Sequence, residues 1–408
     1  MFLIAVIIYI FLCLNVSDLN KQRIIKTTSG PVRGRLQQYD DISYYSYEGI
    51  PYAENPTGSL RFRPPVPREP WTDVFNATQR PPVCPQITLK YKKYEMSEDC
   101  LRLNIFVPAF RTDEILSVLV FVHGGAFHLI SGNTDLIYGP ELLMKRGIIF
   151  VTMNYRLGIL GFMSLDIEDA SAGFNGNEGI YMASGYLRYP DIVLKILRKN
   201  IELVIPSNIE YPLGSEKSMA LAKSIVKFYF DDENFSNWTL NNAFDLISDT
   251  HYVHGVDLWI NMHKERKDSN NVYYYFFDFD GALNWFKTYY NITFPGTSHA
   301  DDLGYVFSTN ATKPKLKSAD KRSLEALNVM LTVVSNFVKF GNPTPKNSTE
   351  FIWPEYGADR KMLLLNDKPC VIKMDPVIRR RIDFWNDIYD EYHDYIANGG
   401  VIEYKITP

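Results

Sequence analysis

The stretch Ser117-Val-Leu-Val-Phe-Val-His-Gly-Gly-Ala-Phe127 decides the fold of this chain. Five apolar residues, Val118 to Val122, lead directly into His123 and a pair of glycines. A short unbroken apolar run that ends in Gly-Gly is typical of a buried strand in a parallel sheet, followed by a tight loop. Glycines let such a loop approach a ligand closely and point its N–H groups inward. An oxyanion hole needs donors fixed in this way, although the same pattern also fits a plain turn after a strand.

Neighbouring stretches extend this strand into a sheet. Residues 97–107 alternate between apolar and polar in their middle, which indicates a half-exposed strand. Residues 135–146 have the pattern of a helix, and residues 147–155 form a second apolar run. A strand, a helix and a strand within about 40 residues form a βαβ unit, so we expect a parallel sheet here.

The remainder of the chain is mainly helical in pattern. Residues 272–279 form an apolar, aromatic run and are the best remaining candidate for a strand. Asp375 followed by Pro376 is a favourable N-cap and first residue for the last helix. The predicted helices cover residues 189–201, 217–230, 240–248, 322–340 and 375–396. The predicted fold class is therefore α/β.

Composition narrows the class of protein and its cellular route. The 408 residues are 46% hydrophobic, which is enough for one large domain or two smaller ones. The net charge of -4 and the lack of a basic stripe exclude nucleic acid as an expected partner. Residues 2–14 are nearly all apolar, and we predict a secretory signal peptide over residues 1–17. Because no Lys or Arg precedes the apolar run, an uncleaved anchor is the alternative; no further membrane span is predicted.

Cysteines and glycosylation signals agree with export. In an oxidising compartment Cys84 and Cys100 are the natural pair, being close in sequence, and Cys370 is left over. Six Asn-x-Ser/Thr sequons support the same route jointly. They begin at Asn76, Asn234, Asn237, Asn291, Asn310 and Asn347. We therefore predict a secreted glycoprotein.

Several motifs, in order along the chain, resemble the type-B carboxylesterase family of the α/β-hydrolases, and secreted insect esterases in particular. The resemblance implies a large, mostly parallel central sheet flanked by helices. It also implies hydrolysis of small-molecule carboxylic esters, in which a Ser attacks, a His moves the proton and an acid orients the His. The matching stretches cover residues 47–53, 61–65, 97–104, 123–127, 154–162, 173–179 and 296–303.

The resemblance assigns candidate roles to individual residues. Glu178 matches the acid of the family and His299 matches its base. The N–H groups of Gly124, Gly125 and Ala126 match the donors of the oxyanion hole. Cys84 and Cys100 match the first disulfide of the family. No cofactor is expected, and because the chain lacks HExxH, Cys-x-x-Cys and P-loop motifs, no metal or phosphate chemistry is expected either.

The nucleophile of the family is missing from the sequence. Its Ser lies in a Gly-x-Ser-x-Gly elbow, and none of the 408 residues forms that pattern. Residues 158–163 match the loop before the elbow strand and residues 173–179 match the acid loop, with only Ser164–Ala172 between them. We therefore predict an internal deletion with its junction within residues 164–173, inside a single incomplete domain over residues 18–408.

Such a deletion has structural and functional consequences. Central strands would be lost, and Val118–Val122 and Ile148–Thr152 would pair with Val272–Phe279 or leave an open apolar edge. Without the Ser the chain is expected to be inactive. A skipped exon and a faulty gene model both explain the junction. The alternative function is that of a non-catalytic esterase homologue that binds a ligand or a partner.

Overall fold

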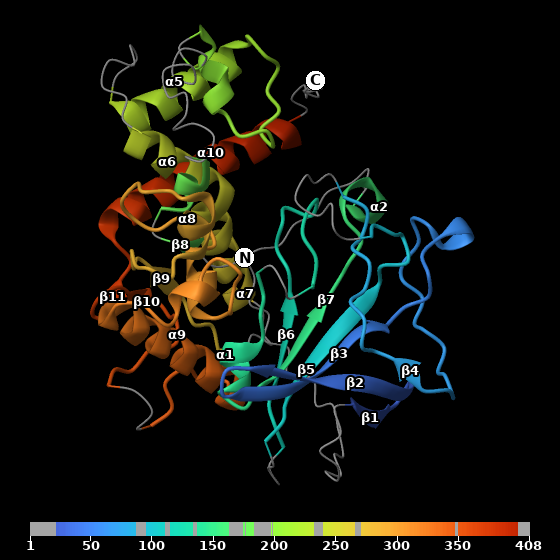
Figure 1. The fold of residues 1–408 in the computed structure, drawn as a ribbon. Helices are drawn as coiled ribbons and strands as arrows, with labels where there is room; N and C mark the ends of the chain where they lie inside the picture. The colour runs from blue at the N-terminus through green and yellow to red at the C-terminus, as the bar shows by residue number, and fades with distance from the viewer. Residues whose placement is uncertain are drawn as a thin grey trace. The chain divides into compact units, whose positions relative to one another are not determined.

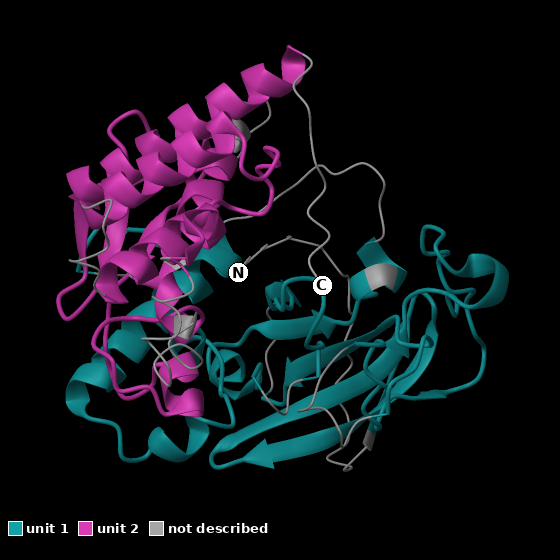
Figure 2. Cartoon of the chain, turned by 90° about the horizontal axis from the view of Figure 1, so that it is seen from above, with its two compact units in different colours: residues 1–169, 303–352 teal, residues 170–302, 353–408 magenta. Residues whose placement is uncertain are grey.

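The computed structural model describes residues 22–86, 95–110, 115–133, 137–162, 174–175, 177–182, 197, 199–231, 240–265, 271–346 and 350–398. The chain divides into two compact units, which Figure 2 shows in teal and magenta. Unit 1 comprises residues 1–169 and 303–352, and unit 2 comprises residues 170–302 and 353–408. The chain first passes from unit 1 to unit 2 within the interval where the sequence predicts a junction. That interval itself, the predicted signal peptide and Asn234, Asn237 and Asn347 lie outside the described residues.

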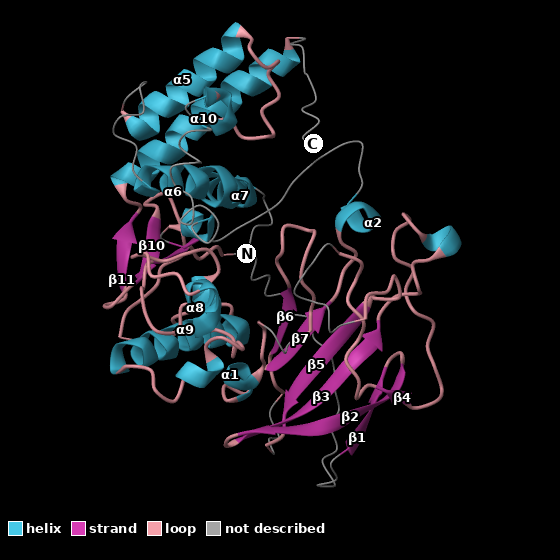
Figure 3. Cartoon of the chain, turned by 45° about the horizontal axis from the view of Figure 1, so that its top comes forward, coloured by secondary structure: helices cyan, strands magenta, loops and turns pink. Residues whose placement is uncertain are grey.

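Unit 1 is built on a sheet of seven described strands, seen side by side in Figures 1 and 3. The strand order is β1-β2-β3-β5-β7-β6, and β4 pairs with β2. The strands are β1 (Gln22–Thr27), β2 (Gly30–Tyr39), β3 (Ile42–Pro51), β4 (Phe75–Asn76), β5 (Arg102–Pro108), β6 (Val118–Val122) and β7 (Ile149–Met153). The two apolar runs that decide the fold are thus strands at the places predicted.

The directions of these strands are mixed. β6 and β7 are parallel, as the predicted βαβ unit requires. The pairs β1–β2, β2–β3, β3–β5 and β5–β7 are antiparallel, so the expectation of a mostly parallel sheet does not hold for this part of the α/β fold. The physical reason lies in the connections: β1 to β2 and β2 to β3 are short hairpins, which can join only antiparallel neighbours.

The sheet of unit 1 buries both of its faces in the middle. One face carries an aliphatic and tyrosine cluster that includes Val32, Tyr47 and Val151. Another cluster is aromatic, with the ring of Phe121 4.9 Å from that of Phe307 and 4.6 Å from that of Tyr138. The helices of this unit are α1 (Glu141–Met144), α2 (Gly158–Phe162), α9 (Lys321–Phe340) and the 3-10 turns η1 (Gly58–Leu60) and η6 (Lys313–Lys315). A further 3-10 turn, η5 (Asp301–Tyr305), runs across the unit boundary.

Strand β6 ends the described strand order and is less buried than its neighbour. Leu119 and Phe121 are buried, whereas Val118, Val120 and Val122 are only half-buried. The alternation shows that one face of β6 packs fully and the other does not. The described residues do not form the predicted pairing of Val118–Val122 with Val272–Phe279, since the strand within residues 272–279 belongs to another sheet.

Unit 2 combines a small sheet with a cluster of helices. Its described strands have the order β11-β10-β9-β8, with β8 (Phe174–Asn175) and β10 (Lys361–Leu365) both parallel to β9 (Tyr275–Phe277). The fourth strand is β11 (Cys370–Lys373). The helices are α5 (Glu216–Phe230), α6 (Leu240–Ser248), α7 (His254–Glu265), α8 (Trp285–Tyr290) and α10 (Pro376–Ala397), with the short turns η2 (Glu178–Met182), η3 (Ile201–Val204) and η4 (Asp249–Val253). Apolar side chains of α5, α6 and α10 meet around the fully buried Trp385.

Helix boundaries follow their caps closely. Asp375 accepts from the N–H of Val377 at 2.7 Å at the start of α10, and Asp320 accepts from the N–H of Ser323 at 2.9 Å at the start of α9. Among the described residues of 135–146 the helix is α1, because Pro140 lacks an N–H and confines the helix to the residues after it. The predicted helix over 189–201 lies almost wholly outside the described residues. No helix in the described ranges is both long enough and apolar enough to cross a membrane.

Candidate active site

The loop after β6 is a tight turn with an unusual backbone. The N–H of His128 donates to the carbonyl of Gly125 at 3.0 Å, and the two residues between them, Ala126 and Phe127, have φ values of +49° and +58°. Positive φ at both central positions defines a type I′ turn, which normally takes Asn and Gly. An L-residue in this region costs about 1–2 kcal/mol. Strain of this kind tends to accumulate at functional sites.

Gly125 is required by its surroundings. Its φ is +119°, and a Cβ atom added to it would lie 2.2 Å from the carbonyl oxygen of Leu129. No side chain fits at that distance. The Gly-Gly pair that the sequence singles out therefore allows the loop to fold back on itself.

Two side chains fix the peptide planes of this loop. The hydroxyl of Tyr155 donates to the carbonyl of His123 at 2.7 Å, and Nδ1 of His123 donates to the carbonyl of Gly124 at 2.7 Å. The two rings stack with centroids 4.3 Å apart. Because C=O and N–H point in opposite directions across a trans peptide, these contacts also fix the directions of the N–H groups of Gly124 and Gly125. No hydrogen bond among the described residues uses the N–H groups of Gly124, Gly125 or Ala126.

His123 is electrostatically neutral in this position. Burial lowers the pKa of His123 to about 4, although the contact with the Gly124 carbonyl acts in the opposite direction. A carbonyl can only accept, so the hydrogen of the neutral ring is on Nδ1. His123 thus contributes no formal charge to the loop.

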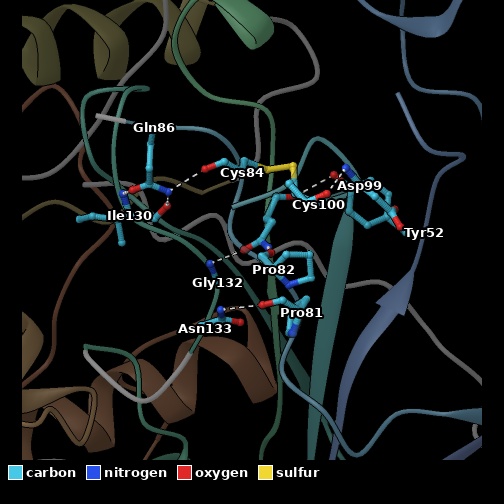
Figure 4. Close-up of a disulfide and its surroundings, with 12 residues drawn as sticks. Tyr52, Pro81, Pro82, Cys84, Gln86, Asp99, Cys100, Ile130, Gly132 and Asn133 are labelled. Atoms are coloured by element: carbon cyan, nitrogen blue, oxygen red, sulfur yellow. Dashed lines mark hydrogen bonds between the residues drawn. A yellow bond between two sulfur atoms is a disulfide. The ribbon is translucent and has the colours of Figure 1, made fainter. Parts of the chain in front are cut away.

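A disulfide supports the far end of the loop, as Figure 4 shows. Cys84 and Cys100 are bonded, as predicted, and both are buried. Close to Cys84, the side-chain amide of Gln86 accepts from the N–H of Ile130 at 2.8 Å and donates to the carbonyl of the same residue at 2.9 Å. Gln86 also donates to the carbonyl of Cys84 at 3.1 Å. The disulfide segment and the loop are therefore linked by one amide side chain.

In unit 2 the structure brings Glu178 and His299 together. Oε2 of Glu178 lies 2.7 Å from Nδ1 of His299, across 121 residues of sequence. Glu178 is 1% exposed, whereas the side chain of His299 keeps a quarter of its exposure. A second contact joins their backbones, since the N–H of His299 donates to the carbonyl of Glu178 at 3.3 Å. Because the carboxylate accepts from Nδ1–H, the basic nitrogen of the neutral ring is Nε2.

Glu178 begins the turn η2, and Asn175 of β8 holds its carboxylate. Oε1 of Glu178 accepts from the backbone N–H of Asn175 at 2.5 Å and from its side-chain amide at 3.2 Å. The N–H of Gly179 donates to Oγ of Ser248 at 2.9 Å. A Cβ on Gly179 would lie 2.3 Å from the carbonyl of Phe244, so the glycine after the acid lets η2 approach α6. The Asn-Glu-Gly sequence is thus more than a surface turn.

The loop that carries His299 is held by a buried carboxyl group. Asp301 accepts from the backbone N–H of Ser298 at 2.7 Å and from that of Lys287 at 3.0 Å. Nζ of Lys287 donates to the carbonyl of Gly296 at 2.7 Å, which fixes the start of the same loop. Burial raises the pKa of Asp301 to about 7, although the N–H donors act against that rise.

A second buried carboxyl group lies behind the acid. The side-chain amide of Asn175 bridges Glu178 to Oδ1 of Asp302, at 3.4 Å from the latter, and the hydroxyl of Tyr275 donates to Oδ2 of Asp302 at 2.8 Å. Burial raises the pKa of Asp302, and the charge of Glu178 adds to the rise. The amide of Asn175 thus bridges two acids in the same interior, and the phenol of Tyr275 binds the second of them.

Other predicted residues have simpler surroundings. Ser298, adjacent to His299, is fully buried. Asn76, Asn291 and Asn310 are exposed. Cys370 is exposed and free. Among the described side chains, no group of three or more His, Cys, Asp or Glu residues is arranged to hold a metal ion.

Sequence reasoning missed the residues that support the site. Tyr155 and Gln86 act on the loop after β6 from 32 and 44 residues away, and Asp301 acts through backbone N–H groups. Tyr155 and Asp301 lie within family-like stretches, residues 154–162 and 296–303, so their positions are the signal that was available. Gln86 lies outside those stretches and has no local pattern that predicts its contacts.

A parallel β6–β7 pair with a glycine loop after β6, together with a Glu–His pair whose carboxylate is buried, is typical of an α/β-hydrolase. A juvenile hormone esterase structure from Manduca sexta, with OTFP covalently attached, has this fold: it superposes with a TM-score of 0.74 at 21% identity, over 90% of this chain and 100% of that one. The model of the carboxylesterase family matches residues 21–172 and 169–385, and the chain therefore belongs to that family.

Curated relatives match a limited part of the chain. A juvenile hormone esterase from Tribolium castaneum is 39% identical over 182 residues, which are 44% of this chain and 29% of that protein. An acetylcholinesterase from Electrophorus electricus is 36% identical over 188 residues, which are 43% and 29% of the two chains. A para-nitrobenzyl esterase from Bacillus subtilis is 36% identical over 172 residues, which are 41% and 34% of the two. The chain thus spans about a third or less of the length of these relatives.

Proposed function

We propose that the protein derives from a secreted carboxylic-ester hydrolase, and that this chain keeps the acid–base pair and the oxyanion loop of that enzyme. The observation that carries the proposal is the 2.7 Å contact between Nδ1 of His299 and Oε2 of Glu178. A buried carboxylate at this nitrogen orients the ring and stabilises the imidazolium that forms during acyl transfer. The family to which the chain belongs supports the same chemistry.

Each retained part has a defined task in that reaction. His299 would take a proton from the attacking hydroxyl at Nε2 and return it to the leaving alcohol. Glu178 would hold the ring in the tautomer with hydrogen on Nδ1. The N–H groups of Gly124, Gly125 and Ala126 would receive the negative charge of the tetrahedral intermediate. The substrate class is a small-molecule carboxylic ester, and no cofactor is needed.

We further propose that the chain as it stands does not turn over esters, because its nucleophile has been removed with an internal segment. None of the 408 residues forms the Gly-x-Ser-x-Gly elbow. Two observations support a junction within residues 164–173: the family match breaks into segments that meet at 169–172, and the boundary between the units falls at 169/170. Residues 18–408 would then form one incomplete domain.

Export of the protein is proposed on separate grounds. The apolar run over residues 2–14 fits a signal peptide. The Cys84–Cys100 bridge fits an oxidising compartment. The exposure of Asn76, Asn291 and Asn310 leaves those sequons accessible to glycosylation.

A binding function is the second candidate. The absence of the elbow from all 408 residues favours it, because a chain that cannot form an acyl-enzyme can still hold an ester or a partner protein. The retained loop and acid–base pair would then serve recognition of a ligand rather than turnover.

Labelling with a fluorescent organophosphonate tests the proposal directly, because only an activated Ser reacts with it. We expect the purified chain to remain unlabelled and to hydrolyse a simple aryl ester no faster than its His299→Ala variant. Two results together would contradict the proposal that the chain lacks a nucleophile. These are stoichiometric labelling of the chain, and ester turnover that the His299→Ala variant abolishes.

Sequencing of transcripts across codons 164–173 tests the junction. A longer transcript that restores an elbow, and whose product is labelled unless its elbow Ser is changed to Ala, would support the enzyme. An abundant short transcript without such a companion would support the binding function instead.

A further inference from the structure

We infer that Tyr252 is a positioning residue for His299, and that it holds the imidazole ring in the plane needed for proton transfer. The inference rests on the proposed function of the Glu178–His299 pair. The two rings are stacked, with centroids 4.4 Å apart and planes inclined by 25°. No sequence motif points to Tyr252, and its role follows from this contact.

One hydrogen bond does not fix an imidazole ring. The contact with Glu178 holds the ring at Nδ1, and that contact by itself packs neither face of the ring. The side chain of His299 is 25% exposed, so the protein does not enclose it on all sides. A flat side chain against one face opposes rotation of the ring. Productive geometry requires orientation to within about 10–20°, which a face contact supplies.

The position of Tyr252 follows from an irregular turn. Residues Asp249–Val253 form a π-helical turn, η4, between α6 and α7. Such turns insert an extra residue into a helix and are frequent at functional sites. In a continuous α-helix Tyr252 would be rotated by about 100°, since each residue turns the helix by that angle. The π-helical turn thus determines which way the ring faces.

The turn is anchored at its first residue. Asp249 is 1% exposed; its Oδ2 accepts from the hydroxyl of Tyr229 at 2.5 Å and forms an ion pair with Arg381, whose Nε lies 3.0 Å away. These partners belong to α5 and α10, so two further helices hold the start of η4. A ring mounted on such a support has little freedom to move.

The same turn is tied to the acid. Ser248, the last residue of α6, accepts from the N–H of Gly179, which follows Glu178 directly. The two partners of the imidazole, Glu178 and Tyr252, are therefore carried by segments that are hydrogen-bonded to each other. Tyr252 and Glu178 can then act as one frame for the ring of His299.

A second stack in unit 2 provides a matched control. The rings of His254 and Tyr389 lie 4.9 Å apart and are inclined by 8°. Nε2 of His254 contacts the amide oxygen of Asn386, not a carboxylate. Tyr389→Leu therefore removes a tyrosine from a histidine stack in the same unit without touching the Glu178–His299 pair.

The test is nuclear magnetic resonance of the full chain labelled with 15N-histidine. A strongly deshielded Nδ1–H signal should be present in the unmodified chain and lost in Glu178→Gln. We expect Tyr252→Leu to broaden that signal beyond detection, whereas Tyr252→Phe, which keeps the ring, and Tyr389→Leu should preserve it. If the Nδ1–H signal is lost only when the aromatic ring at position 252 is removed, Tyr252 positions His299. General destabilisation would affect the signal in the other variants as well.

The outcomes separate the two claims. A signal that is absent from the unmodified chain, or that survives Glu178→Gln, contradicts the proposed acid–base pair and with it the role of Tyr252. A signal that depends on Glu178 but persists in Tyr252→Leu contradicts only the positioning role. If Tyr252→Leu does not fold, nuclear Overhauser contacts between the two rings in the unmodified chain decide the question, and their absence overturns it.

Discussion

In unit 1 the candidate donors are backbone N–H groups, whereas in unit 2 the candidate acid and base are two side chains. The loop after β6 depends on glycines, positive φ values and carbonyls held by Tyr155 and His123. The pair of Glu178 and His299 depends on a buried carboxylate with its own set of donors. A backbone site should therefore respond to steric change and cross-links, and a side-chain site to loss of charge.

The largest effect is expected from Gly125→Ala. The new Cβ would meet the Leu129 carbonyl at 2.2 Å while φ stays at +119°. Strain and overpacking together should lower the free energy of opening of β6 and β7 by about 4 kcal/mol, measured by hydrogen exchange and mass spectrometry. Gly58→Ala is the control: its φ is +57° with open space around it, so about 1 kcal/mol is expected. Equal effects would contradict the steric argument.

Removal of the disulfide should have the next largest effect. Cys84 and Cys100 are 16 residues apart, and a bridge over a loop of this size stabilises by about 3 kcal/mol. In the Cys84→Ser, Cys100→Ser double variant, urea unfolding and hydrogen exchange should show this loss in unit 1. Gln86→Ala, which keeps the bridge, should cost only about 1 kcal/mol. Unchanged exchange around Ile130 in both variants would refute the link between bridge and loop.

Lowering the pH should reduce the free energy of unfolding of unit 1, because His123 is buried there. The pKa of His123 is about 4 in the folded chain against 6.5 in the unfolded one, so between these values the unfolded chain binds the extra proton. The free energy of unfolding therefore contains a contribution from the neutral His123. This contribution is complete above pH 6.5 and is lost as the pH falls to 4, by about 3 kcal/mol in total. The measurement is the pH dependence of β6–β7 opening by hydrogen exchange. His123→Gln should flatten that dependence, and an unchanged slope would show that another group is responsible.

The smallest of these effects is expected in unit 2, from Glu178→Gln. The substitution keeps the shape but replaces the oxygen facing His299 or Asn175 with an amide donor. Loss of hydrogen bonds to a buried carboxylate should cost about 2 kcal/mol, measured by exchange of peptides from η2 and α6. Unit 1 peptides should not change. The control is Glu216→Gln, at the exposed start of α5, which should cost less than about 0.5 kcal/mol. A loss as large as that of Glu178→Gln would contradict the special role of the buried carboxylate.

Much of the fold could be predicted because its signals are local. Apolar runs gave β6 and β7, and caps such as Asp320 and Asp375 set the starts of α9 and α10. The antiparallel half of the sheet in unit 1 could not be predicted in this way, since strand direction depends on connections between segments. Residues 272–279 kept only the three-residue strand β9, because apolar character alone does not define strand length.

The residues of the candidate site also differ in whether local sequence signals predict them. Glu178, His299 and the glycine loop could be found from family-like motifs, and the contact between the first two is present in the structure. Gln86, Tyr155 and Tyr252 could not, because each acts through a tertiary contact with no sequence period. The orientation of Tyr252 also depends on a π-helical turn, which hydrophobic patterning does not reveal.

The type I′ turn at Ala126 and Phe127 has a consequence for the order of folding. At about 1–2 kcal/mol per residue, roughly one unfolded chain in a hundred holds both residues at positive φ at any moment. The turn therefore cannot guide the pairing of β6 with β7 and must close after those strands and the Gln86 contact exist. We expect its amides to gain protection late in refolding, so a newly made chain forms the loop after β6 only after the sheet of unit 1.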